Sequence, residues 1–175
     1  MTGARYRALF QKTMKGRHVT ILLAGLTLLV LLLSVPGSLS DAFDRGGIYL
    51  FTRAFLEDIP RRLAGPGRFR FVLQPAIAIF LGIRSGLADA RAGRPPYLYG
   101  VLFHRDLRRE LVRTGFETVA NLLLMGILLD AVFQWVILGV SHPGAALVVG
   151  PGLIVAPYSL ARALSNRLAR PRRQS

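Results

Sequence analysis

One acidic residue, Asp130, lies near the middle of the longest apolar stretch of this chain, residues 118–140. As a helix, a stretch of this length rises about 34 Å, enough to cross the hydrocarbon core of a bilayer. A carboxylate at that depth costs at least about 2.5 kcal/mol, so it must be paired, hydrogen-bonded or protonated. Gly126, Asp130 and Gln134 recur every four residues and therefore share one stripe of the helix. A small residue beside two polar groups predicts that this stripe packs against another helix.

The sequence offers two partners for Asp130. Gly150-Pro151-Gly152 interrupts the next apolar stretch and predicts a broken or kinked helix, because proline removes one amide and its ring clashes with the preceding turn. Counted from the turn at 141–144, Gly152 and Asp130 lie at similar depths, so amides freed at a break could bind the carboxylate. Gln74, in another apolar stretch, is the second candidate.

Asp130 supports two hypotheses of different classes. The first is a proton or cation site at a discontinuous helix, as in secondary transporters. The second is an interhelical hydrogen bond that only fixes the bundle. We favour the second, because the sequence places no other titratable residue at the same depth.

The sequence indicates no catalytic, cofactor or metal site. The chain has no cysteine, and its three histidines are far apart in the sequence. No serine, histidine and acid form a recognisable catalytic set, and no glycine-rich phosphate loop is present. We therefore expect a protein that is not an enzyme and has no cofactor.

Composition and charge pattern place these residues in a membrane protein. Of the 175 residues 52% are hydrophobic, yet the formal net charge is +14. The arginines gather in blocks that end at uncharged stretches, as expected of residues next to a membrane with anionic lipid. A nucleic-acid-binding domain would instead place them on one face of a polar fold, so we expect no nucleic-acid partner.

We expect an all-α fold, a polytopic membrane bundle that forms a single domain over residues 1–175. Apolar runs predict the spans, and mixed aromatic and charged segments predict helices that lie at the membrane interface. The expected spans are about 19–36, 69–86, 118–140 and 144–162, and the expected interfacial helices are about 47–62 and 97–114.

The first span has an alternative interpretation. Residues 19–35 follow a basic arm and precede Pro36-Gly37 and Ser38-Leu39-Ser40, a pattern that resembles a cleaved signal peptide. The 17-residue apolar run is longer than the 7–15 residues usual in such peptides. We therefore favour an uncleaved anchor.

The second span is short, and the charge distribution decides it. Residues 71–83 are only 13 in number, so a re-entrant segment is the alternative. Segments 1–18, 84–116 and 162–175 carry five, seven and five lysines and arginines. All three face the cytoplasm only if 71–83 spans, which is what the positive-inside rule requires. Six arginines in 36–70 are many for the outer side, and for this reason the re-entrant alternative stays open.

Residues 73–97, LQPAIAIFLGIRSGLADARAGRPPY, resemble a run shared by small uncharacterised bacterial inner-membrane proteins. The later runs at 130–134, 142–144 and 157–158 resemble other parts of the same proteins, so the resemblance covers roughly the last hundred residues. It implies a multi-pass protein of the bacterial inner membrane and no known activity.

These observations predict a protein that acts by association, as an accessory subunit or a small homo-oligomer, in a bilayer that includes anionic lipids. The alternative is a small transporter or channel that uses Asp130. Both termini are expected on the cytoplasmic side.

Overall fold

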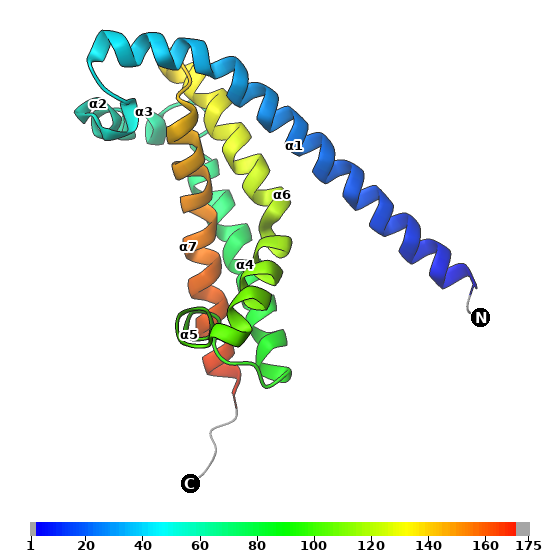
Figure 1. Ribbon diagram of the computed structural model, residues 1–175. Helices are drawn as coiled ribbons and strands as arrows, with labels where there is room; N and C mark the ends of the chain where they lie inside the picture. Colours follow the sequence, from blue (N-terminus) through cyan, green and yellow to red (C-terminus); the bar gives the residue numbers. More distant parts are fainter. Residues whose placement is uncertain (1–2, 171–175) are drawn as a thin grey trace.

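The computed structural model describes residues 3–170, with side chains from residue 17 on, and this part of the chain is all-α (Figure 1). Four of its helices are long and apolar enough to cross a membrane: Arg17–Arg45 of α1, and α4, α6 and α7. This confirms the predicted all-α fold with four long apolar helices. The elements are α1 (Gly3–Arg45), a 3-10 turn η1 (Tyr49–Phe51), α2 (Arg53–Glu57), α3 (Ile59–Ala64), α4 (Arg70–Arg91), α5 (Tyr97–Phe103), α6 (Arg105–Leu138) and α7 (Pro143–Ala169).

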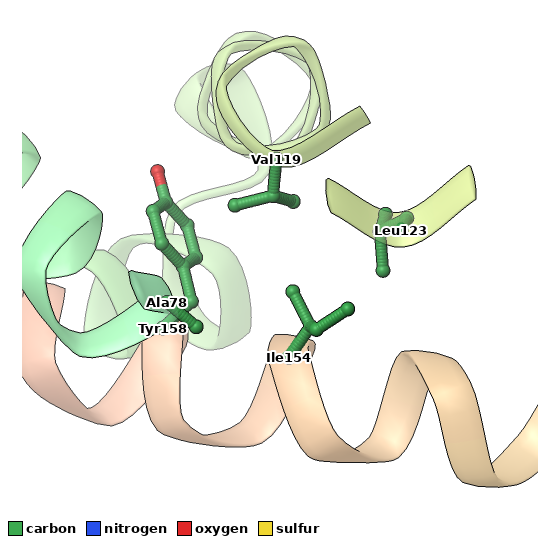
Figure 2. Close-up of a cluster of buried hydrophobic side chains, with 5 residues drawn as sticks. All are labelled: Ala78, Val119, Leu123, Ile154 and Tyr158. Carbon is green, nitrogen blue, oxygen red and sulfur yellow. The ribbon is translucent and has the colours of Figure 1, made fainter. Parts of the chain in front are cut away.

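Helices α4, α6 and α7 form the core of the bundle. Figure 1 shows α4 and α7 descending from the end with α2 and α3, here the upper end, to the end with α5, here the lower end. Helix α6 runs the opposite way, and the most extensive contact is between α4 and α7. One side chain of α4, two of α6 and two of α7 meet in a buried apolar cluster (Figure 2): Ala78, Val119, Leu123, Ile154 and Tyr158.

Glycines let α4 approach α7 closely. A Cβ atom on Gly82 would lie 2.5 Å from the carbonyl oxygen of Tyr158, and one on Gly86 would collide with the carbonyl of Arg162. Ala78, Gly82 and Gly86 follow one another at four-residue spacing, so they form one stripe of small residues on α4. Dispersion contacts along such a stripe hold membrane helices together without any need for a hydrophobic driving force.

Helix α1 contacts the core along one polar stripe and lies at an angle to it in Figure 1. The stripe, here the polar seam, repeats every seven residues. The Thr20 hydroxyl donates to Asn121 Oδ1 over 2.8 Å, and the Thr27 hydroxyl donates to the Leu124 carbonyl over 3.3 Å. Its members are Thr20, Thr27, Ser34 and Asp41.

The spans are longer than the sequence indicated. Pro36 does not end α1, which continues to Arg45. Helix α4 is continuous over 22 residues in spite of Pro75, and it reaches from the upper to the lower end, unlike a re-entrant segment. A proline removes one backbone hydrogen bond, but the turns on either side keep theirs and a membrane helix can continue through it.

The two expected interfacial helices are divided differently. Residues 47–62 form three short helical pieces, because Thr52 has an extended backbone and Pro60 opens a new helix at α3. Residues 97–114 are split at His104, whose backbone is also extended. From Arg105 on, the chain belongs to α6 and continues directly into the span.

Candidate functional site

Asp130 lies in a buried ion-pair cluster at the upper end. Its side chain is 1% exposed, and its Oδ1 atom is 2.7 Å from an Arg70 guanidinium nitrogen. Its Oδ2 atom accepts a 2.7 Å hydrogen bond from the Gln134 amide and lies 3.5 Å from the Arg62 guanidinium. Both arginines are 2% exposed, so the carboxylate is enclosed by charged and polar groups rather than by lipid or water.

The turn between α3 and α4 brings the two arginines to Asp130. Gly67 has φ +82°, and a Cβ atom there would lie 2.5 Å from the Phe133 ring, so the turn requires glycine on both counts. Folded against Phe133, the chain places Arg70 at the start of α4, with its guanidinium 5.4 Å from the centre of that ring. Arg70 also donates to the Leu129 carbonyl over 3.0 Å. A cation over an aromatic face is stabilised electrostatically.

Further hydrogen bonds and a ring stack extend the cluster to η1, to Asp58 between α2 and α3, and to α1. The Tyr49 hydroxyl donates to Asp58 over 2.9 Å and accepts from Arg62 over 3.4 Å. The His142 ring stacks on the Tyr49 ring with centroids 3.8 Å apart, and its Nε2 atom is 3.0 Å from Asp41 on α1. We call these residues the upper cluster: Asp41, Tyr49, Asp58, Arg62, Arg70, Asp130, Gln134 and His142.

Burial shifts the protonation of two members of the upper cluster. Burial, helped by the hydrogen bond to Asp58, raises the pKa of Tyr49 to about 12. Burial also lowers the pKa of His142, although the hydrogen bond to Asp41 acts in the opposite direction. At neutral pH Tyr49 is therefore a hydroxyl donor and His142 is an uncharged ring.

A second buried ion pair lies at the lower end. Arg162 of α7 holds Asp89 of α4 with two nitrogen–oxygen contacts of 2.7 and 3.2 Å, and both side chains are nearly inaccessible. The guanidinium also donates to the Tyr158 hydroxyl over 3.1 Å and lies 4.4 Å from the centre of the Tyr97 ring. Burial raises the pKa of Tyr97. We call these four residues the lower cluster; bidentate arginine–carboxylate geometry makes it a directional link between α4 and α7.

The glycines and the glutamine that the sequence singled out around Asp130 lie in different surroundings. Gly126 and Gly150 lie at the closest approach of α6 and α7, since a Cβ on Gly150 would be 2.8 Å from the Ile127 amide nitrogen. Gln74 is buried near Gly126 but makes no hydrogen bond to any described protein atom. Gly152 faces open space, where an added Cβ would meet nothing within 4 Å.

The expected partners of Asp130 were wrong. Helix α7 runs without interruption through Gly150-Pro151-Gly152, so no amides of a broken helix face the carboxylate. Gln74 does not reach it either. Arginines from the α3–α4 region pair with Asp130 instead.

Sequence reasoning missed both arginines, although a signal for them was present. Six arginines in 36–70 are too many for the outer side of a membrane by the positive-inside rule. Four of the six form ion pairs in the structure: Arg62 and Arg70 with Asp130, Arg45 with Asp41, and Arg61 with Asp58. An excess of arginines on the outer side, together with a lone intramembrane acid, is therefore a pattern from which their pairing could have been expected.

The two clusters are suited to holding helices together. Each central carboxylate is already held by guanidinium groups, so neither is available as a general base. Within residues 17–170, no three or more histidine, aspartate or glutamate side chains are grouped so that they could hold a metal ion.

Comparisons with protein families, with curated proteins and with solved structures find no match to this chain. The resemblance to small bacterial inner-membrane proteins stays a prediction, as does the expectation that the protein is not an enzyme.

Proposed function

We propose that this protein acts by association inside the membrane, and that α1 is the helix that contacts the partner. The observation that carries the proposal is the exposure of α1, whose most apolar part is only 11% buried against 39% for α7, together with Gly25 in its middle, where an added Cβ would meet nothing within 4 Å. Glycine inside a helix costs about 1 kcal/mol relative to alanine. No neighbour among the described residues requires a bare backbone there, whereas a partner helix at close approach would.

The surroundings of Gly25 support this role. Leu22, Gly25, Leu29 and Leu32 follow one another at spacings of three, four and three residues, on the side of α1 opposite the polar seam. We call these four residues the outer stripe. Its leucines are exposed, and only 11% of the most apolar part of α1 is buried, against 39% for α7. The spacing is that of a left-handed pair of helices.

We further propose that Asp130 fixes the upper end rather than moving a cation. A transport site needs a carboxylate that can release its partner and reach water, but Asp130 is held by two arginines and Gln134. Reconstituted ion flux that is abolished by Asp130→Asn, with the fold intact, would restore the transporter alternative.

We propose an uncleaved first span in the bacterial inner membrane, with both termini in the cytoplasm. Residues 38–40, where a signal peptide would be cut, lie inside α1, and Asp41 just beyond them contacts His142. The burial of Arg62 and Arg70 in ion pairs with Asp130 supports this orientation, because these two arginines belong to the helix bundle rather than to its exposed outer surface.

Native mass spectrometry of the full chain, purified in a mild detergent from its own membrane, tests the association. We expect the wild type in a complex with a second copy or with another membrane subunit. Gly25→Leu should release the monomer, because the added side chain separates the helices.

Gly152→Leu is the matched control, since Gly152 is also an exposed helix glycine with open space around it. It should keep the complex. A wild type that is monomeric without any co-purifying protein would overturn the proposal, and so would equal loss of the complex in both variants.

A further inference from the structure

Four arginines of α6 surround a hollow at the lower end of the molecule. The hollow has a volume of about 540 Å3 and is lined by Arg105, Arg108, Arg109, Val112, Arg113 and Phe116. These residues come from three successive turns of one helix, so they are held on a continuous rigid element. We call this feature the arginine hollow.

Two arginines of the hollow have hydrogen-bond or ion-pair partners within the protein, and the other two have none among the described residues. Arg108 donates to the carbonyls of Val101 and Leu102, and Arg113 pairs with Glu117 at 2.8 Å, so both are fixed in place. Arg105 and Arg109 have no ion-pair or hydrogen-bond partner among the described residues. Since Glu117 is the one acid paired there, the hollow keeps an excess of positive charge that a ligand can neutralise.

The wall of the hollow is almost wholly apolar, because the arginines line it mainly with their carbon atoms, beside Val112 and Phe116. Val112 and Phe116 are 46% and 62% exposed, and the uncharged part of α6 begins two residues beyond Phe116. The arginines therefore lie where α6 leaves the apolar zone, and the two apolar side chains lie at its edge. In a phospholipid, too, a charged phosphate lies next to the beginning of the apolar acyl chains.

We propose that the arginine hollow binds the headgroup of one anionic phospholipid. Guanidinium groups bind phosphate oxygens in pairs, because their planar donors match the spacing of two oxygens. Arg105 and Arg109 supply the free donors, Arg108 and Arg113 add fixed positive charge, and the first acyl carbons rest on Val112 and Phe116. This inference concerns a lipid ligand and does not depend on the association through α1.

Native mass spectrometry of the detergent-solubilised full chain with added lipid tests the site. The probes are phosphatidylglycerol, phosphatidylcholine and inorganic phosphate. We expect the wild type to retain phosphatidylglycerol at least tenfold more tightly than phosphatidylcholine. Arg105→Gln/Arg109→Gln should remove most of that preference, because each arginine near an anionic headgroup contributes about a factor of five.

Arg91→Gln/Arg167→Gln is the control, since it removes the same charge from two exposed arginines on α4 and α7. It should keep the preference, and circular dichroism should show all variants folded. Equal weakening by both double variants would mean bulk charge only and overturn the site. Inorganic phosphate that displaces the lipid would assign the hollow to a soluble anion and overturn the lipid headgroup.

Discussion

At the scale of single residues, the environment of Asp130 supports the structural role that we propose for it. The carboxylate is buried together with two arginines. Each of these three groups loses its hydration on burial, and its attraction to the oppositely charged partner offsets that cost. Removing one partner leaves a buried charge unpaired, which costs far more than the pair contributes. We therefore expect that replacing one of these three members of the upper cluster lowers the stability strongly, whereas replacing all three together with apolar residues lowers it little.

We predict that Asp130→Asn destabilises the protein by about 3–5 kcal/mol, because it leaves Arg62 and Arg70 buried without their acid. Equilibrium unfolding in mixed micelles, followed by circular dichroism, measures the change. Arg62→Met/Arg70→Met/Asp130→Leu should recover most of the loss, since no charge then stays buried.

Asp106→Asn on the same helix is the control for Asp130→Asn, because Asp106 is exposed and its change should stay within about 0.5 kcal/mol. If Asp130→Asn were as stable as Asp106→Asn, the paired geometry of the upper cluster would be contradicted.

We predict from the burial of His142 how the free energy of unfolding changes with pH. Burial, with repulsion from Arg45 and Arg62, lowers its pKa below the ordinary 6.5, and the bond to Asp41 only partly offsets this. As the pH falls through 6.5 the unfolded chain therefore binds more protons than the folded chain, so the free energy of unfolding falls with it.

His142→Gln removes this titration and should flatten the profile below pH 6.5. Unfolding midpoints of both proteins over this range give the measurement. Parallel profiles for the wild type and His142→Gln would exclude the histidine as the source.

At the scale of the elements, glycines control how closely the helices pack. Gly150 faces the backbone of α6, where a Cβ would be 2.8 Å from Ile127 nitrogen, whereas Gly152 two residues later faces open space. The two positions share one helix and differ in what surrounds them, so they make a matched pair.

We predict that Gly150→Ala destabilises the protein by about 1–3 kcal/mol, because backbone atoms of α6 have to move away. Gly152→Ala should instead be neutral or stabilise by up to about 1 kcal/mol, through its higher helix propensity. The same unfolding measurement compares them. A loss of equal size in both variants would contradict the close α6–α7 contact.

The sequence predicted elements better than contacts. Uncharged length identified the four long helices, because crossing a bilayer constrains each stretch on its own. In the stripe through Gly126, Asp130 and Gln134, Gly126 lies against α7 and the two polar side chains are buried. Helix ends were less accurate, since a membrane helix continues through Pro36 and Pro151 when its neighbours hold it.

The pairing of Asp130 could not be read from the sequence in the same way. Arg62 precedes it by 68 residues and reaches it only through the turn at Gly67. The pairing in the lower cluster was missed for a similar reason, since Asp89 and Arg162 lie 73 residues apart in the sequence. The hydropathy of one segment predicts whether a residue lies inside the membrane. Its partners depend on which distant segments the fold brings beside it.

At the scale of the whole molecule, buried ion pairs link the core helices at both ends of the bundle, whereas one side of α1 is exposed. The upper and lower clusters hold α4, α6 and α7, and buried arginine–carboxylate pairs give this core a fixed register. Helix α1 packs on it through the polar seam and a few neighbouring residues, such as Gly37 beside Val140, and leaves the outer stripe exposed. A core held at both ends, with one exposed apolar helix, fits the proposal that the protein acts by association.

Site-specific photocrosslinking on α1 in the protein's own membrane tests this claim most directly. A diazirine-bearing amino acid replaces Leu29 on the outer stripe or, as the control, Leu28, which is also exposed but about 100° around the helix. We predict that position 29 yields an adduct with a protein, a second copy or another subunit, whereas position 28 yields adducts with lipid. Lipid adducts alone at both positions would contradict the account.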